Sequence, residues 1–266
     1  PTSECPFFKI CFEKDCCLQN PGFFYQCAYL SKSVIKPVSL ENYSYFSIPK
    51  CYSLLSMQAL NQAGILPIQN HSTIQLSGKQ VMIGFLDTGI DYQNPIFQHL
   101  DKTTRIAGIW DQTIQSGTPP ESFYYGSHYT PDMINEALAS EDPYSLVPSV
   151  DNNGHGTFLA SIAAGSGDPD AQFIGAAPES VIAVVKLKQA KQYLRDYYFI
   201  PDTAPAFQEN DIMLGMRYLH LLAEKLKLPL IFCLHLAAIW RTLRLSSALD
   251  HRAAVYLVIQ SDSSIG

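Results

Sequence analysis

Val81-Met82-Ile83-Gly84-Phe85-Leu86-Asp87 is an almost wholly apolar run that ends in a carboxylate. An apolar run of this length without polar alternation is typical of a strand buried on both faces of a parallel sheet. Two similar runs follow at Val181–Leu187 and Pro229–Leu234. Helical patterns lie between them, one opening at His155 and one, long and amphipathic, capped by Glu209-Asn210-Asp211. This alternation predicts an α/β fold of three layers, a parallel sheet with helices on both faces.

Two side chains with complementary chemistry are expected at one edge of this sheet. Asp87 follows the carboxyl end of a buried strand, where open α/β sheets place their sites. His155 stands between Gly154 and Gly156 at the start of a helix, so its imidazole has no bulk beside it. A buried aspartate that accepts a hydrogen bond from one ring nitrogen fixes the tautomer of the histidine as a general base. Taken alone, the histidine motif also fits a capped helix start with a solvated imidazole.

Long blocks around both residues resemble one enzyme family. VMIGFLDTGID at Val81–Asp91, DNNGHGTFLASIAAGSG at Asp151–Gly167 and Gly175-Ala176-Ala177-Pro178 resemble the aspartate block, the histidine block and the following turn of subtilisin-like serine proteases, the subtilases. Within the family, the chain resembles the germination-associated subtilases of spore-forming clostridia. The phrases LKQAKQYLRDYYFI at Leu187–Ile200 and QENDIMLGMRYL at Gln208–Leu219 carry that part of the resemblance.

The resemblance implies a three-layer subtilisin-like fold, present here in incomplete form, and a serine endopeptidase that cleaves peptide or protein substrates. Asp87 would orient His155, and His155 would be the base that activates a serine. No cofactor is required by this chemistry. Asp91 corresponds to a structural calcium ligand in some family members, and a turn-capping carboxylate is the alternative interpretation. The family resemblance places the protein in the cytoplasm or with the spore.

The serine block of a subtilase is not found in this sequence. The family needs a nucleophile in a Gly-Thr-Ser context that opens a buried helix. No Gly-Thr-Ser occurs, and the only Gly-Thr pairs are Gly117-Thr118 and Gly156-Thr157. We therefore expect a chain truncated before its serine block and inactive as given. The alternative is a catalytically dead pseudoprotease that binds or regulates, with the segment 111–150 as a partner surface.

The domain organisation is predicted in three parts. Residues 1–50 are expected to be a propeptide remnant or a poorly ordered segment, because they lack a sustained period. Residues 51–234 are the front of the catalytic domain, with helices at Tyr52–Gly64 and Pro131–Ala139 and a polar insertion at 111–150. Residues 235–266 are an atypical tail that is either out of frame or genuine. The out-of-frame interpretation is considered because codons read one nucleotide earlier permit a family-like Gly-Ser-Asn-Met. A genuine tail would form a helix at 239–249 and a strand at 255–259.

Composition excludes some functions. A net charge of -6 leaves no basic footprint for nucleic acid or for an anionic membrane, so neither is expected as a partner. No apolar run reaches the length of a membrane span, and no export signal is seen. Five of the seven cysteines lie in the first 27 residues without metal-ligand spacing, which favours unpaired thiols in a reducing compartment. The oligomeric state does not follow from the sequence.

Overall fold

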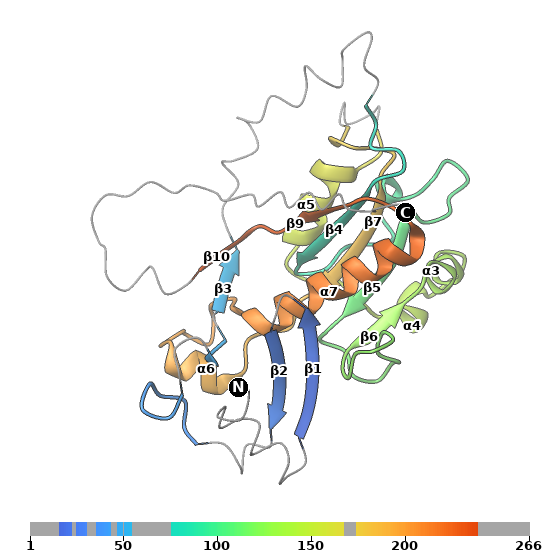
Figure 1. Ribbon diagram of the computed structural model, residues 1–266. Helices are drawn as coiled ribbons and strands as arrows, with labels where there is room; N and C mark the ends of the chain where they lie inside the picture. Colours follow the sequence, from blue (N-terminus) through green and yellow to red (C-terminus); the bar gives the residue numbers. More distant parts are fainter. Residues whose placement is uncertain are drawn as a thin grey trace.

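The computed structural model describes residues 16–22, 25–30, 36–43, 47–49, 51–54, 76–167 and 174–238. At its centre is a five-stranded sheet with the strand order β6-β5-β7-β4-β9 (Figure 1). β4, β5, β7 and β9 run parallel, and β6 pairs antiparallel with β5 at one edge. The strands are β4 (Met82–Asp87), β5 (Ile106–Asp111), β6 (Ser127–Tyr129), β7 (Val181–Lys186) and β9 (Leu230–Cys233).

The three predicted strands are present as β4, β7 and β9, whereas β5 and β6 were missed. The run Ile106–Asp111 directly follows the polar stretch Asp101–Arg105 and contains Gly108, so it does not stand out as an uninterrupted apolar segment. Asp111, the expected start of the insertion, is the last residue of β5. The insertion then returns to the sheet through β6, so it contributes an edge strand to the core.

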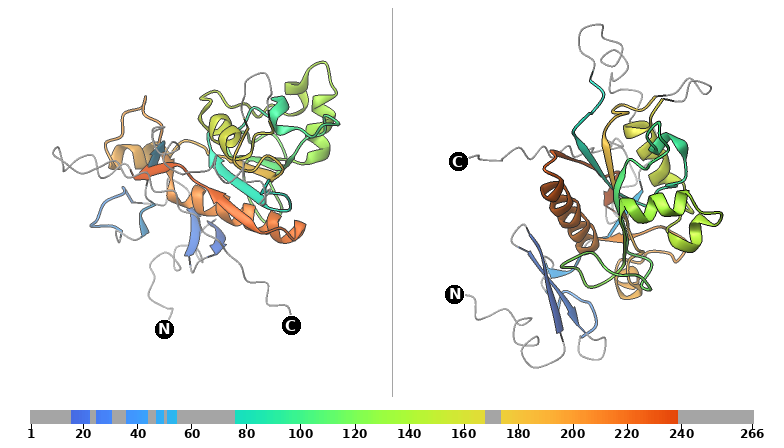
Figure 2. Two further views of the ribbon diagram at one scale, coloured as in Figure 1. Left: turned by 90° about the horizontal axis from the view of Figure 1, so that it is seen from above. Right: turned by 90° about the vertical axis from the view of Figure 1, so that its right-hand side faces the viewer.

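Helices cover both faces of this sheet, which confirms the predicted three-layer α/β architecture. α5 (His155–Ala164), α3 (Pro131–Leu138), the short α4 (Pro143–Leu146) and the 3-10 turn η3 (Pro95–Phe97) lie on one side. α7 (Glu209–Leu226) runs along the other side, as the right-hand view of Figure 2 shows.

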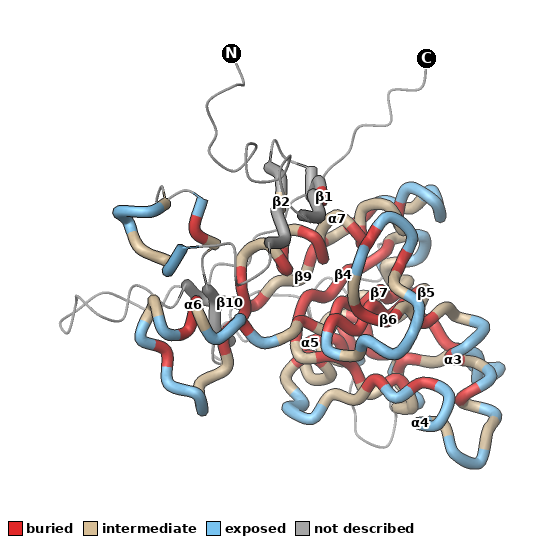
Figure 3. The backbone as a smooth tube through the Cα atoms, turned by 90° about the horizontal axis from the view of Figure 1, so that it is seen from below, coloured by how far each residue is buried: buried red, intermediate tan, exposed pale blue. Residues whose placement is uncertain are grey.

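The two faces of β4 enter two different apolar cores. Ile83 and Phe85 belong to a buried cluster that includes Ala160 of α5. Met82 and Leu86 belong to a second cluster, which includes several residues of α7. Every residue of β4 is buried, and Figure 3 shows the sheet as the most enclosed part of the chain. Since each large apolar side chain contributes about 1.5–3 kcal/mol when buried, this strand anchors both layers.

Two glycines allow α7 to lie close to the sheet. A Cβ atom at Gly84 would lie 2.7 Å from Leu219 Cδ1, and one at Gly215 would lie 2.7 Å from Leu86 Cδ2. The leucine of each element therefore fills the space left by the glycine of the other. This packing holds β4, and with it Asp87, against a rigid support.

Part of the N-terminal segment, predicted as a propeptide remnant or a poorly ordered segment, forms regular secondary structure. β1 (Cys16–Gly22) and β2 (Tyr25–Leu30) form an antiparallel hairpin. The hairpin packs against α7, with Cys27 touching the α7 core cluster (Figure 1). Gln19 Nε2 donates a hydrogen bond of 3.1 Å to the Ser122 carbonyl. Strands this short give too few apolar–polar alternations for a clear two-residue period, so the hairpin was not predicted from the sequence.

A second, three-stranded antiparallel sheet contradicts part of the predicted helix at Tyr52–Gly64. β3 (Cys51–Leu54) lies between β8 (Phe207–Gln208) and β10 (Leu236–Ala238). Residues 52–54 are therefore strand, because partners distant in sequence supply their backbone hydrogen bonds. Residues 55–64 lie outside the described ranges, as do the predicted helix at 239–249 and the predicted strand at 255–259. Within the predicted tail, Leu236–Ala238 form β10 and His235 precedes it.

The predicted long helix is present as α7, but its start differs in detail. No side-chain hydrogen bond caps the helix from Gln208, and Asp211 is instead buried. Asp211 accepts a hydrogen bond of 2.7 Å from the Tyr125 hydroxyl and pairs with the Lys188 ammonium. The predicted helix at Pro131–Ala139 is α3, and a short α6 (Gln192–Tyr197) was not predicted. Among the described residues, no helix combines the length and apolarity that a membrane crossing needs.

Candidate functional site

Asp87 is the last residue of β4 and lies at the carboxyl edge of the parallel sheet. Its side chain is buried, with 1% of the residue exposed. The backbone N–H of Thr88 donates a hydrogen bond of 2.7 Å to Asp87 Oδ1, and the Thr88 hydroxyl lies 3.2 Å from the same oxygen. A carboxylate that accepts such bonds is held in one rotamer. The strand and its turn therefore fix where Asp87 points.

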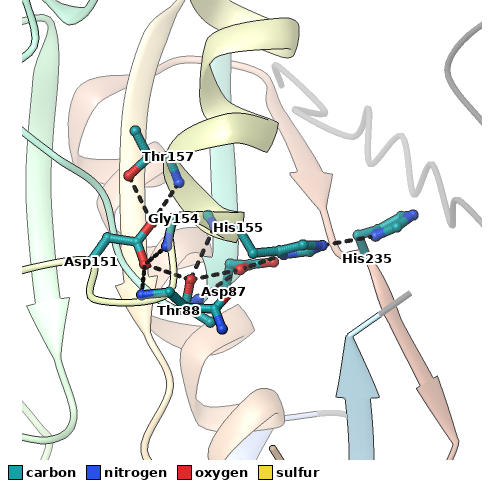
Figure 4. A network of polar contacts seen from close by, with 9 residues as sticks. Asp87, Thr88, Asp151, Gly154, His155, Thr157 and His235 are labelled. Carbon is teal, nitrogen blue, oxygen red and sulfur yellow. Dashed lines mark hydrogen bonds and ion pairs between the residues drawn. The ribbon is translucent and has the colours of Figure 1, made fainter. Parts of the chain in front are cut away.

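His155 is the first residue of α5, and its imidazole meets Asp87. Nδ1 of His155 lies 2.8 Å from Oδ1 of Asp87 (Figure 4). The preceding Gly154 has φ +81°, in the left-handed region that side chains rarely adopt, and this turn brings the chain into the helix. With the Nδ1 proton directed at the carboxylate, Nε2 carries the lone pair that a general base needs. The structure thus brings the two predicted residues together.

Gly156 has a steric reason to be glycine. A Cβ atom at this position would overlap the Gly89 carbonyl oxygen and lie 3.1 Å from Asp87 Cβ. The first turn of α5 therefore rests directly on the turn that follows β4. This close approach sets the length of the contact between His155 and Asp87.

Asp151 braces the same junction, and its role was not anticipated. Its Oδ2 accepts hydrogen bonds from the N–H and hydroxyl of Thr157, at 2.8 and 2.7 Å. Its Oδ1 accepts bonds from the Thr88 hydroxyl at 2.7 Å and from the Gly154 N–H at 3.0 Å (Figure 4). Burial alone would raise the pKa of this carboxyl, but the bonds from Thr157, Thr88 and Gly154 outweigh it and lower the pKa.

The signal for Asp151 in the sequence was weak. Asp151 lies three residues before Gly154, the N-cap of α5, and is therefore not at the position where a capping carboxylate is expected. The sequence did not indicate that the same carboxylate also binds Thr88. That bond ties the strand carrying Asp87 to the helix carrying His155.

A third titratable side chain, His235, faces the other ring nitrogen of His155. His235 Nδ1 lies 3.4 Å from His155 Nε2, and the ring centroids are 5.4 Å apart with an interplanar angle of 28°. Burial and the neighbouring His155 lower the pKa of His235, against the opposing effect of Asp87. His235 was assigned to the atypical tail. Its position follows from β9, which pairs with β4 through Phe85 and Cys233, so that two residues further on His235 reaches the edge where Asp87 lies.

Asp91 lies in the turn after β4 and behaves as a local turn residue. Its Oδ1 accepts a hydrogen bond of 3.3 Å from the Gln93 N–H, and its own N–H donates to the Thr157 hydroxyl at 2.9 Å. The contact with Gln93 fits the turn-capping interpretation of the Asp91 carboxylate. In the part of the chain that is described, no cluster of three or more histidine, cysteine or acidic side chains could hold a metal ion.

A second strand-end carboxylate, Asp111, is structural. It is fully buried, accepts a hydrogen bond of 2.7 Å from the Ser149 hydroxyl and lies 3.4 Å from the Lys186 ammonium. Lys186 also donates to the Val150 carbonyl at 2.8 Å. These contacts return the end of the insertion to the sheet, just ahead of Asp151.

Comparison with known proteins yields one family model. The model of the subtilase family matches residues 78–207, a stretch that contains Asp87, Asp151 and His155. His235 lies beyond the matched residues. The match therefore covers the aspartate and histidine halves of the site and not the third side chain.

Individual relatives agree with this match. The subtilisin-like protease SBT2.2 of Arabidopsis thaliana is 32% identical over 131 residues, which are 42% of this chain and 15% of the plant protein. The subtilisin-like protease SBT3.7 of the same plant is 25% identical over 209 residues, covering 73% of this chain and 26% of its own length. The chain thus spans well under half of these relatives.

One solved structure supports both the fold and the clostridial resemblance. The CspB protease of Clostridium perfringens superimposes with a TM-score of 0.51 and 32% sequence identity. The match covers 64% of this chain and 31% of that one.

Proposed function

We propose that this chain, whose residues 78–207 match the model of the subtilase family, carries the aspartate and histidine of a subtilisin-class serine endopeptidase. The observation that carries the proposal is the 2.8 Å contact between Asp87 and His155, made at the carboxyl edge of a parallel sheet. A contact between these side chains in this orientation is what acyl transfer through a serine requires. The proposed substrates are peptides or proteins.

In this proposal each side chain has a defined step. His155 Nε2 takes the proton of the serine hydroxyl as the serine attacks the peptide carbonyl, and later returns it to the leaving amine. Asp87 keeps the proton on Nδ1 and stabilises the imidazolium that forms between these steps. Asp151 is a positioning residue, since it touches Thr88 and Thr157 and acts through them.

The chain alone is proposed to be inactive. Its 266 residues contain no Gly-Thr-Ser sequence that could present a nucleophile. In subtilisin, the example from which this cost is known, loss of the nucleophile lowers turnover by about a million-fold. Without a serine to activate, the base His155 cannot contribute to turnover, and only the small rate enhancement from substrate binding remains.

Covalent labelling tests the proposal. The 266-residue chain should not react with a fluorophosphonate probe. Residues 76–233 joined to the serine-bearing part of a subtilase should react, and the reaction should be lost in His155→Ala but kept in His99→Ala. The control changes an exposed histidine in the turn that precedes β5. A fusion that shows a cooperative thermal transition but labels equally with and without His155 would refute the role of this base.

The geometry of His235 favours a second candidate, a pseudoprotease that binds rather than cleaves. The imidazole of His235 lies against Nε2 of His155, on the side from which a serine would have to approach. A stable binding module should unfold cooperatively and keep a defined surface at the insertion 111–150. Calorimetry separates the two candidates, because an incomplete catalytic sheet with an exposed edge is expected to aggregate on heating.

A further inference from the structure

The buried carboxylate of Asp111 joins the two ends of the insertion 111–150. Near the start of the insertion, the N–H and the hydroxyl of Thr113 donate hydrogen bonds of 2.8 and 2.6 Å to Asp111 Oδ1. Near its end, the Ser149 hydroxyl donates a bond of 2.7 Å to Asp111 Oδ2. Each carboxylate oxygen thus holds one end of the insertion, so a displacement of either end is transmitted to Asp111.

The Lys186 ammonium links this carboxylate to the backbone ahead of α5. Nζ of Lys186 lies 3.4 Å from Asp111 Oδ2 and donates a hydrogen bond of 2.8 Å to the Val150 carbonyl. Val150 directly precedes Asp151, the residue that braces α5 on the turn after β4 (Figure 4). The ammonium therefore fixes the chain where the insertion ends and the histidine motif begins.

The hydrocarbon stem of Lys186 lies against the turn after β4. A Cβ atom at Gly89 would lie 3.2 Å from Lys186 Cδ and 3.4 Å from both Cα and Cβ of Asp151. Lys186 is also the β7 residue that pairs with Asp87 of β4. The first turn of α5 rests on this same turn. One side chain thus links the end of the insertion to the turn that sets the contact between Asp87 and His155.

We propose that Lys186 is a positioning residue that couples the insertion 111–150 to the Asp87–His155 pair. The proposal rests on the proposed function, in which His155 is the base. Lys186 acts through the backbone ahead of α5 and through the turn after β4. A ligand or partner that binds the insertion and moves its ends would therefore change the geometry of the base.

The ion pair between Lys186 and Asp111 has to be separated from this positioning role. The Asp111 side chain has no exposed surface, and the Lys186 side chain is 14% exposed. Removal of one partner of a buried ion pair leaves an uncompensated charge and is strongly destabilising. A loss of stability alone would therefore not demonstrate positioning. The test needs a readout at His155 and a variant without the unpaired charge.

The Nδ1 proton of His155 provides this readout, by one-dimensional proton NMR of the 266-residue chain in water. Lys186→Met keeps the stem but has no donor, so the resonance should move upfield. Its exchange with water should be roughly 10–100-fold faster, the ratio expected when a hydrogen bond to a charged group is lost. Lys186→Arg keeps the charge and N–H donors and should change the proton less. Lys79→Met, the same substitution at an exposed lysine ahead of β4, is the matched control and should change nothing.

A double variant separates positioning from stability. Combining Lys186→Met with Asp111→Asn removes the unpaired charge, so the free energy of unfolding in urea should rise above that of Lys186→Met. The His155 proton should stay perturbed, because the bond to the Val150 carbonyl is still missing. Ser149→Ala detaches the end of the insertion from Asp111 and should shift the proton in the same direction.

Two outcomes overturn the proposal. One is a Lys186→Met chain that loses stability with an unchanged His155 proton, and the other is a double variant that restores the proton and the stability together. These measurements use the chain without a serine, so they do not depend on peptide cleavage. Absent labelling of the fusion described above would refute the peptidase role and leave the coupling standing.

Discussion

His155 Nδ1 lies 2.8 Å from Asp87 Oδ1, although the two residues are 68 positions apart in the chain. One is delivered by the end of a buried strand and the other by the first turn of a helix. Neither side chain reaches the other through a flexible loop. The contact therefore depends on how closely α5 rests on the turn after β4.

Replacing Asp87 by Asn should change the chemical shift of the His155 Nδ1 proton without removing its hydrogen-bond acceptor. Asn keeps an acceptor oxygen of similar size, but a neutral one, so the Nδ1–H···O bond is weaker. We expect the far-downfield exchangeable proton of His155 to move upfield or disappear in Asp87→Asn. One-dimensional proton NMR of the two chains in water measures this, with His99→Ala as the control that should leave the resonance in place. An unchanged resonance would mean that the proton does not belong to this pair.

Gly156→Ala and Gly154→Ala should destabilise the chain for different reasons and to different extents. At Gly156 the added Cβ would overlap the Gly89 carbonyl oxygen, which must then move away with the helix. Overpacking of this kind costs about 1–3 kcal/mol, and the contact between His155 and Asp87 should lengthen. At Gly154 nothing lies within 4 Å of the added atom, so only the left-handed backbone is penalised, by about 1–2 kcal/mol.

Two measurements distinguish the glycine variants: the chemical shift of the His155 Nδ1 proton and the free energy of unfolding in urea. Both variants should lose stability, and only Gly156→Ala should perturb the proton. If Gly154→Ala perturbs the proton more strongly, the close approach at Gly156 does not set the site geometry.

Asp151 should make stability depend on pH in the acid range. Its pKa is lowered in the folded chain, because hydrogen bonds from Thr157, Thr88 and Gly154 outweigh the effect of burial. The folded state therefore binds this proton less readily than the unfolded state does. Its contribution is fully present above the ordinary pKa of 3.8 and is lost as the pH falls through the lower folded value.

Urea unfolding at several pH values tests this prediction. Asp151→Asn should lower the free energy of unfolding by about 1–3 kcal/mol at pH 7, because a neutral amide cannot accept the same set of bonds. The difference between the two chains should shrink toward pH 3. A constant difference across the range would exclude Asp151 as the titrating group.

Cys27 should be slow to alkylate as long as the hairpin is docked on α7. Burial and then the nearby Asp211 raise the pKa of this thiol from 9.0 to about 11. At pH 8 the thiolate fraction is then about 100-fold lower than in the unfolded chain, and thiolate is the reactive form. Iodoacetamide labelling of the native and the denatured chain, read by mass spectrometry at Cys27, should show at least this ratio. Equal rates would mean that β1 and β2 do not pack on α7.

Several parts of this protein were determined by local sequence alone. β4, β7 and β9 were identified by their uninterrupted apolar runs. A strand that is buried on both faces cannot tolerate the polar alternation of a strand with one exposed face. The same reasoning placed Asp87 at a strand end and His155 at a helix start. The glycines around His155 indicated an imidazole with no bulk beside it, whereas the close approach of Gly156 to the turn at Gly89 was seen only in the structure.

Other features depend on partners that are distant in the chain. β3 forms because β8 and β10 supply its hydrogen bonds. The residues Cys51–Leu54 contain no pattern that predicts those partners. β5 lies next to β7 at the centre of the sheet, although its own residues resemble the end of a loop. The hairpin of β1 and β2 is stabilised by α7, whose sequence lies at the other end of the described chain.

The resemblance to the subtilase family and the pairing of Asp87 with His155 were thus readable from sequence, since both rest on short, contiguous blocks. The position of His235 was decided only by the tertiary structure. Parallel pairing of β9 with β4 carries a residue from beyond the matched blocks to the nitrogen of His155 that would meet a serine. Strand register is a relationship between segments, so no local pattern around His235 could reveal it.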